Sequence, residues 1–193
     1  MADDGALPAG AFASWLRGME AALRGEAAAD VPCGTCTACC TSSQFVHIAP
    51  DETEALAHIP KELLFRAPRM PRGHVLLGYD ERGRCPMLTD GGCSIYEHRP
   101  RTCRTYDCRV FTATGLSVDD GDPGKTAIAR QARRWVFTFP TDDDRRRHAA
   151  VGAAVGAAVG AAVTALQAGG PTRPASVTEL AVRAVETHEE FIV

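Results

Sequence analysis

Apolar residues near the start of the chain recur at intervals of three and four residues, which is the period of one helix face. These anchors are Ala9, Phe12, Trp15, Leu16, Met19 and Leu23. We therefore predict an amphipathic helix over residues 9–28, which ends before the Val31–Pro32 pair.

Shorter apolar runs follow, each bounded by turn residues. Residues 44–48 and 74–79 have the composition of strands, and an Asp-Glu-Arg-Gly turn predicts that residues 84–88 return as a hairpin partner. A second turn at 90–92 predicts another small hairpin. The proline-punctuated stretch over 60–71 is predicted to be irregular.

The remaining periodic segments predict helices, several of them with recognisable caps. They are a helix that ends at His58 and helices over residues 99–106, 124–135, 142–167 and 176–190.

Together these elements predict an α+β fold that is mainly helical. A small cysteine-rich metal-binding core with short hairpins is flanked by N-terminal and C-terminal helices. We expect a single domain over residues 1–193, with the helix at 9–28, the cysteine-cluster core at 30–110 and a C-terminal helical part at 120–193.

A tandem Val-Gly-Ala-Ala repeat fills residues 151–162 and permits two interpretations. The uncharged run over 149–166 has about the minimum length of a membrane span. However, Ala and Gly contribute little to insertion, so we favour a soluble helix with a flat small-residue face and expect no membrane partner.

The charge balance argues against one class of partner. The chain has 21 Lys and Arg against 24 Asp and Glu, so it lacks the positive excess of nucleic-acid-binding proteins, and no nucleic-acid partner is expected. The first residues, Met1-Ala2-Asp3-Asp4, are acidic where a secretory signal is positive, which predicts a cytoplasmic protein. In that reducing compartment the 8 cysteines favour metal binding or catalysis over disulfides.

The spacing of Cys33, Cys36 and Cys39 matches the first three ligands of a bacterial ferredoxin run. The match then fails, because Cys40 follows directly, although Cys85 precedes a proline and could supply a fourth thiolate. In an extended segment adjacent side chains point to opposite faces, so Cys39 and Cys40 are not expected to bind one ion together. Either they serve two neighbouring metal positions, or one of them packs as a small apolar residue.

Eight thiols are enough to bind either zinc or an iron–sulfur cluster. They could form two four-thiolate zinc sites, or one iron–sulfur cluster with thiols left for catalysis or packing. Six arginines lie near the cysteines in sequence, and their guanidinium groups could offset thiolate charge. We single out Arg99 and Arg104 as the residues expected to hydrogen-bond the ligand sulfurs, and we favour iron–sulfur narrowly over zinc.

Three patterns, CxxCxxCC at 33–40, CPxL at 85–88 and CxIYExRPxxCRxYxC at 93–108, together resemble a known family. The chain is similar to the YkgJ-type CxxCxxCC cysteine-cluster proteins, described as zinc- or iron-chelating domains, over about residues 30–110. Relatives of that family include the flagellin lysine N-methylase, for which an iron–sulfur cluster has been proposed. The resemblance implies a ligand set of Cys33, Cys36, Cys39, Cys40, Cys85, Cys93, Cys103 and Cys108.

Other motifs carry less chemistry. The stretch over 121–126 superficially resembles a phosphate-binding loop but has Asp119 where the motif needs glycine, so we interpret it as a turn and helix start. The histidines show no paired ligand spacing, and we expect them to be exposed or hydrogen-bonded.

Two classes of function remain open. The first is a cytoplasmic metalloprotein with an iron–sulfur cluster, such as a 4Fe–4S cluster, or another polynuclear site that serves redox or group-transfer chemistry. The second is a non-catalytic zinc-binding module for chelation or protein interaction. Substrate, protein partner and oligomeric state are not predicted.

Overall fold

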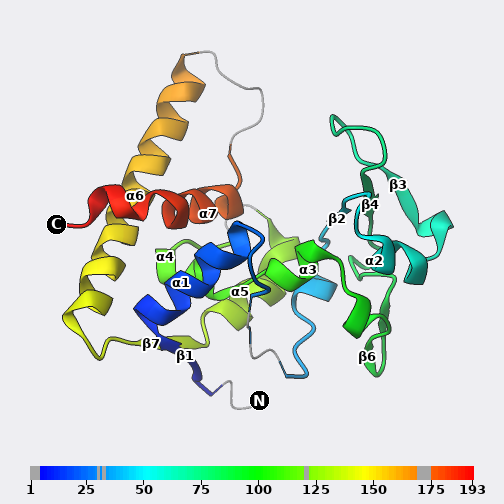
Figure 1. Ribbon diagram of the computed structural model, residues 1–193, viewed down its shortest axis with the longest axis horizontal. Coiled ribbons are helices and arrows are strands. Elements are labelled where there is room, and N and C mark those ends of the chain that lie inside the picture. Colours follow the sequence, from blue (N-terminus) through cyan, green and yellow to red (C-terminus); the bar gives the residue numbers. More distant parts are fainter. Residues whose placement is uncertain (1–4, 30, 32–33, 120–121, 169–174) are drawn as a thin grey trace.

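The computed structural model describes residues 5–29, 31, 34–119, 122–168 and 175–193. Within them the chain is mainly helical with small sheets, so the predicted α+β class is confirmed. Figure 1 shows two parts: the long helices gather on one side with β1 and β7, and strands β2, β3, β4 and β6 gather on the other, with α3 between the two parts.

The helical part contains the N-terminal helix, which is shorter than predicted. Strand β1 (Leu7–Ala11) precedes helix α1 (Phe12–Leu23) and pairs in parallel with β7 (Trp135–Thr138). The predicted start at residue 9 was therefore wrong, because Leu7 aligns with Trp135 and distant strand pairing overrides the local helical spacing. The helix ends at Leu23, and Gly25 follows in a left-handed conformation with φ of 74°.

The same pairing shortens a second predicted helix. Helix α5 (Thr126–Ala132) follows a 3-10 turn at Pro123–Lys125 and ends before Trp135 enters β7. Helix α4 (Arg109–Thr114) was not predicted.

The two C-terminal helices begin where their caps predict. Helix α6 (Asp142–Gln167) is capped by Thr141 and α7 (Val177–Thr187) by Ser176, each through a capping box. A 3-10 turn, His188–Phe191, continues α7. Residues from all these helices and both paired strands form one core: Ala9, Phe12, Trp15, Leu16, Met19, Cys108, Val110, Phe111, Ala113, Val118, Ile128, Ala129, Ala132, Trp135, Val151, Ala181 and Val185.

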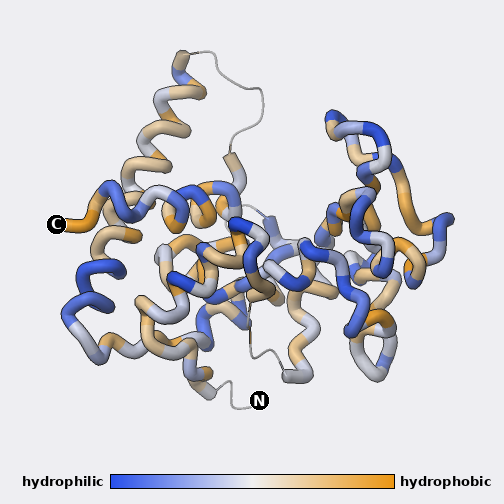
Figure 2. The backbone as a smooth tube through the Cα atoms, in the orientation of Figure 1, coloured by the Kyte–Doolittle hydropathy of each residue, from blue (hydrophilic) through white to orange (hydrophobic). Residues whose placement is uncertain are grey.

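Helix α6 changes character along its length. Figure 2 shows a hydrophilic first turn and an apolar remainder, and Ala150, Val151 and Ala154 pack into the core. The end of the helix extends away from the other helices, with Val163 and Leu166 exposed (Figure 1). By length and apolarity α6 could span a membrane, and only 22% of its most apolar window is buried. The expectation of a soluble helix stays a prediction.

Asp144 ties the start of α6 to the start of α1. Its carboxylate accepts from the Thr141 backbone N–H at 3.0 Å and from the Ala13 N–H at 2.9 Å. The hydrogen bond from the Thr141 hydroxyl, followed by that from Ala13, lowers the pKa of Asp144.

We expect Asp144→Ala to lower the melting temperature by on the order of 5 °C, because two helix starts lose their acceptor. Asp142→Ala, at an exposed position of the same turn, is the matched control. Because the pKa of Asp144 is depressed, its contribution is present above about pH 4 and lost as the pH falls further. Thermal melts between pH 3 and pH 7 measure this, and equal losses in the two variants would contradict the assigned role.

The small-sheet part contains three short antiparallel strands in the order β2-β4-β3. These are β2 (Val46–Ile48), β4 (Val75–Leu77) and β3 (Leu64–Arg66). The prediction of irregular structure over residues 60–71 was wrong at β3, which lies inside that stretch. Helix α2 (Thr53–His58) confirms the predicted helix that ends at His58, but the predicted cap was wrong, because among the described residues no side chain caps its start. A 3-10 turn, Lys61–Leu63, leads into β3.

The predicted hairpin between 74–79 and 84–88 was wrong. Strand β4 pairs with β2 along one edge and with β3 along the other, so no edge is left for a hairpin partner. In the turn after β4, the Asp80 N–H donates a hydrogen bond to the Arg84 carbonyl at 2.8 Å. The following segment turns away, and the Cys85 N–H donates to the Cys40 carbonyl at 2.7 Å.

The second hairpin is confirmed. Strands β5 (Leu88–Thr89) and β6 (Gly92–Cys93) pair, and a 3-10 turn, Tyr96–His98, leads to helix α3 (Arg101–Thr105). The core of this part among the described residues is Val46, Ile48, Ala55, Ile59, Leu77, Met87 and Ile95, with three cysteines packed against it: Cys85, Cys93 and Cys103.

Candidate metal centre

The adjacent cysteines lie on a 3-10 turn, Cys39–Thr41, and not on extended backbone. The two thiols interact with each other, and the extended backbone on which the expectation of opposite faces rested is not present. In a 3-10 turn consecutive side chains point about 120° apart around the axis, whereas in a strand they point about 180° apart.

The contact gives the two sulfurs different acidities. The hydrogen bond from the Cys40 thiol lowers the pKa of Cys39 to about 7. The same hydrogen bond, with burial, raises the pKa of Cys40. Cys39 is therefore the thiol of this pair that most readily becomes a thiolate, the form that binds metal.

Five of the predicted ligands come together from separate segments. Cys40 interacts electrostatically with Cys39, Cys85 and Cys103. Cys103 interacts with Cys39, Cys85 and Cys93. The 3-10 turn, the β5–β6 hairpin region and helix α3 thus bring these five thiols within electrostatic range of one another, and metal ligation by them stays a prediction.

Burial makes this group costly to ionise without a cation. It raises the pKa of Cys103 to about 12, and the neighbouring thiols raise it further. Burial also raises the pKa of Cys85. A bound metal reverses this effect, since its positive charge stabilises each thiolate that contacts it.

The other three predicted ligands are not among these five interacting thiols. Cys36 lies in the preceding loop, where its sulfur accepts from the Ala38 N–H at 3.5 Å. Cys108 is buried in the helical core, where its sulfur accepts from the Trp135 indole N–H at 3.2 Å. Cys33 lies outside the described residues. Metal ligation by these three stays a prediction.

The spacing of the thiols is wider than one metal ion requires. Across the described part of the chain, no three sulfur atoms lie within 4.8 Å of one another. Tetrahedral zinc with Zn–S bonds of about 2.3 Å holds its sulfurs about 3.8 Å apart.

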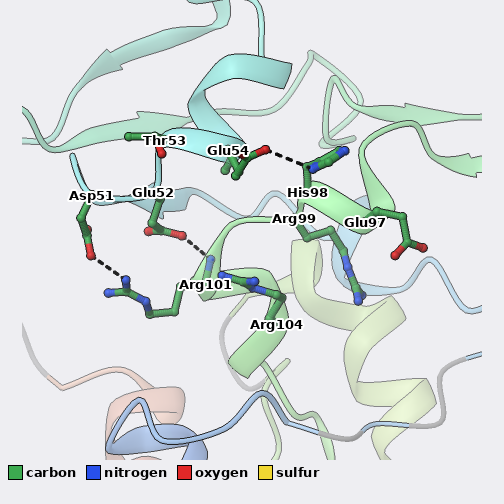
Figure 3. Close-up of a pocket in the computed structure, with 10 residues that line it drawn as sticks. Asp51, Glu52, Thr53, Glu54, Glu97, His98, Arg99, Arg101 and Arg104 are labelled. Carbon is green, nitrogen blue, oxygen red and sulfur yellow. Dashed lines mark hydrogen bonds and ion pairs between the residues drawn. The ribbon is translucent and has the colours of Figure 1, made fainter.

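Arg99 stands beside the thiols. Its guanidinium lies 3.6 Å from the centre of the Tyr96 ring, and its Nε donates to the Tyr96 carbonyl at 2.8 Å. Its positive charge lowers the pKa of Cys39 and of Cys103. At Cys103 burial and the neighbouring thiols raise the pKa by more than Arg99 lowers it. Arg104, with Arg99, lines a neighbouring pocket of about 260 Å³ (Figure 3), and its predicted contact with sulfur stays a prediction.

Tyr106 was not singled out in the sequence, although it stands two residues before Cys108. Burial raises its pKa, and its hydroxyl interacts electrostatically with Cys39 and Cys108. Within the described residues this buried hydroxyl has no hydrogen-bond partner. A buried donor without an acceptor beside thiols fits a centre that supplies one, such as a metal-bound sulfur.

Lys125 holds the cysteine turn from outside. Its ammonium donates to the carbonyls of Ser42 at 2.6 Å and Ser43 at 3.1 Å, directly after the Cys39–Thr41 turn. Burial lowers the pKa of Lys125. The stretch that superficially resembled a phosphate-binding loop is a turn and helix start, as predicted, and its lysine binds backbone carbonyls.

We expect Lys125→Met to speed the release of bound metal to a chelator by about tenfold, because the turn loses its anchor outside the ligand set. Lys125→Arg should restore much of the retention. Lys61→Met, at an exposed position, is the matched control. Rates of metal release to a colorimetric chelator measure the effect. Equal rates in all variants would show that Lys125 does not stabilise the metal centre.

Comparison with protein families gives a match over the cysteine-rich part of the chain. Residues 32–123 match the CxxCxxCC family, described as a candidate zinc- or iron-chelating domain. No curated protein and no solved structure matches the chain. The matched segment contains the five converging thiols and ends just before Lys125. Residues 32–123 therefore match the CxxCxxCC domain family, whose description as zinc- or iron-chelating supports metal binding through the cysteines of this segment.

Proposed function

We propose that the protein binds one polynuclear iron–sulfur cluster through the thiolates that converge between the 3-10 turn, the β5–β6 region and α3. The observation that carries the proposal is the single electrostatic group formed by Cys39, Cys40, Cys85, Cys93 and Cys103. The narrower choice of iron–sulfur over zinc rests on the geometry of the group and its surroundings.

The spacing supports more than one metal ion. In an iron–sulfur cluster different thiolates bind different iron atoms, so the ligand sulfurs stand further apart than around one zinc. Cys39 and Cys40, which interact with each other, offer two sulfurs from consecutive residues. Five thiols exceed the four that one zinc site takes, which leaves one for packing or for reaction.

The surroundings also suit a cluster. Arg99 brings a positive charge toward Cys39 and Cys103, and the Tyr106 hydroxyl is a buried donor that lacks an acceptor. Such groups stabilise cluster charge and tune its potential by hydrogen-bonding sulfur. When bound, the cluster would supply electron transfer or support group-transfer chemistry, and unoxidised thiols favour a cytoplasmic location.

Purification without oxygen, followed by visible absorption and by iron, zinc and sulfide analysis, tests the proposal. We expect a coloured protein with iron and acid-labile sulfide in equal amounts. Met87→Leu, a volume-conserving change in the neighbouring core, should leave the colour unchanged. A colourless protein that carries two zinc ions would overturn the iron assignment and favour the structural module.

A further inference from the structure

Two histidines and a glutamate meet on the surface of the small-sheet part. Glu54 and His58 lie one turn apart on α2, and His98 ends the 3-10 turn Tyr96–His98. One ligand atom from each of the three side chains lies within 4.8 Å of the other two. Figure 3 shows the Glu54 carboxylate turned toward the His98 ring.

The two histidine rings lie in contact, and the tautomer of one of them is fixed. The rings of His58 and His98 stack in parallel, with centroids 3.6 Å apart and an interplanar angle of 8°. The His58 Nδ1 lies 2.8 Å from the backbone carbonyl of Glu54, and a carbonyl only accepts, so Nδ1 carries the proton. The Nε2 lone pair of His58 is therefore free to bind a cation, which is the arrangement commonly found in metal-binding histidines.

The third ligand supplies charge. The Nδ1 of His98 lies 3.8 Å from Oε2 of Glu54, too far for a hydrogen bond but close enough for both to contact one ion. Metal–nitrogen bonds of about 2.1 Å need the ligand atoms within about 4 Å of one another, so these atoms have to approach one another by up to about 1 Å. The stacked rings also have to rotate until their in-plane lone pairs point at one ion, and the exposure of Glu54 and His58 leaves room for this movement.

We propose that Glu54, His58 and His98 bind a single borderline divalent transition-metal ion, with Zn²⁺ the expected one. Two imidazoles and one carboxylate are the donor set that suits zinc, whereas the thiol group suits zinc or iron–sulfur. The site is independent of the proposed cluster, because none of its ligands is a cysteine.

The position of the site makes the ion exchangeable. Glu54 and His98 line the pocket of about 260 Å³, so water or a small ligand completes the coordination from that side. Glu54 and His58 are exposed, which leaves a short path to solvent.

Titration of the full chain, with its cysteine centre already loaded and quantified, tests the site. Calorimetry with Zn²⁺ should detect one additional ion per chain, while the absorption spectrum of the cysteine centre stays unchanged. His58→Ala and His98→Ala should each weaken this binding at least about tenfold, because each removes a ligand. Glu62→Gln, a nearby exposed acid, is the matched control and should bind as the parent does.

Substitution with Co²⁺ identifies the donors. Binding at the proposed site gives weak visible bands without thiolate charge-transfer absorption, and histidine ring NMR signals of the zinc form shift for His58 and His98. Absence of an additional ion, or binding that survives both histidine substitutions, would overturn the site. Either result leaves the cluster proposal standing, since that proposal is read from the iron and sulfide content.

Discussion

Cys103→Ser is expected to reduce the metal bound to the protein to below about a tenth of the parent level. Cys103 comes from helix α3 and interacts with three other thiols of the group, so its removal takes a ligand from the centre of the arrangement. Serine keeps the size of the side chain but provides a hard, weakly acidic hydroxyl in place of a soft thiolate.

The measurement is metal and sulfide content per chain after anaerobic purification, with circular dichroism to confirm that the helices persist. Ser94→Ala serves as the control, since its hydroxyl only donates to the Met87 carbonyl at 3.0 Å beside the same hairpin. Full metal retention in the Cys103 variant would remove this thiol from the ligand set.

Removal of the metal is expected to unfold the small-sheet part while the helical part stays folded. The strands of the small part are two or three residues long, and its buried core is far smaller than that of the helices across the described residues. Cys85, Cys93 and Cys103 pack against that small core, so a metal bound by them stabilises it directly. For small domains of this kind the free energy of metal binding becomes free energy of folding.

Hydrogen exchange measured by mass spectrometry, before and after chelation under reducing conditions, resolves the two parts. Amides of β2 and β4 should lose protection by at least about 100-fold, whereas amides of α1 and α6 should change by less than about threefold. Equal losses in both parts would mean that the metal supports the whole chain, and no loss in either would mean that it does not support folding.

Local sequence patterns were enough to predict the starts of α6 and α7 and the presence of a metal-binding domain. Thr141 with Asp144 and Ser176 with Glu179 form capping boxes from neighbouring residues, so their helices begin where expected. The family resemblance implied the set of candidate thiol ligands, and their binding to metal stays a prediction.

Long-range pairing could not be predicted from local patterns. Ala9 has the spacing of a helix anchor, yet it lies in a strand because residues 7–11 pair with residues 135–138. The direction of Cys39 and Cys40 depends on a 3-10 turn whose end is held by Lys125, far along the chain. His58 and His98 escaped notice because their closeness exists only after α2 and the Tyr96–His98 turn pack together.

X-ray absorption at the iron edge of the anaerobically purified protein tests the central claim most directly. We predict a first shell made of sulfur at about 2.3 Å with a second shell of iron, because thiolates from three segments would share one polynuclear centre. A first shell of nitrogen and oxygen, or iron with no metal neighbour, would contradict it.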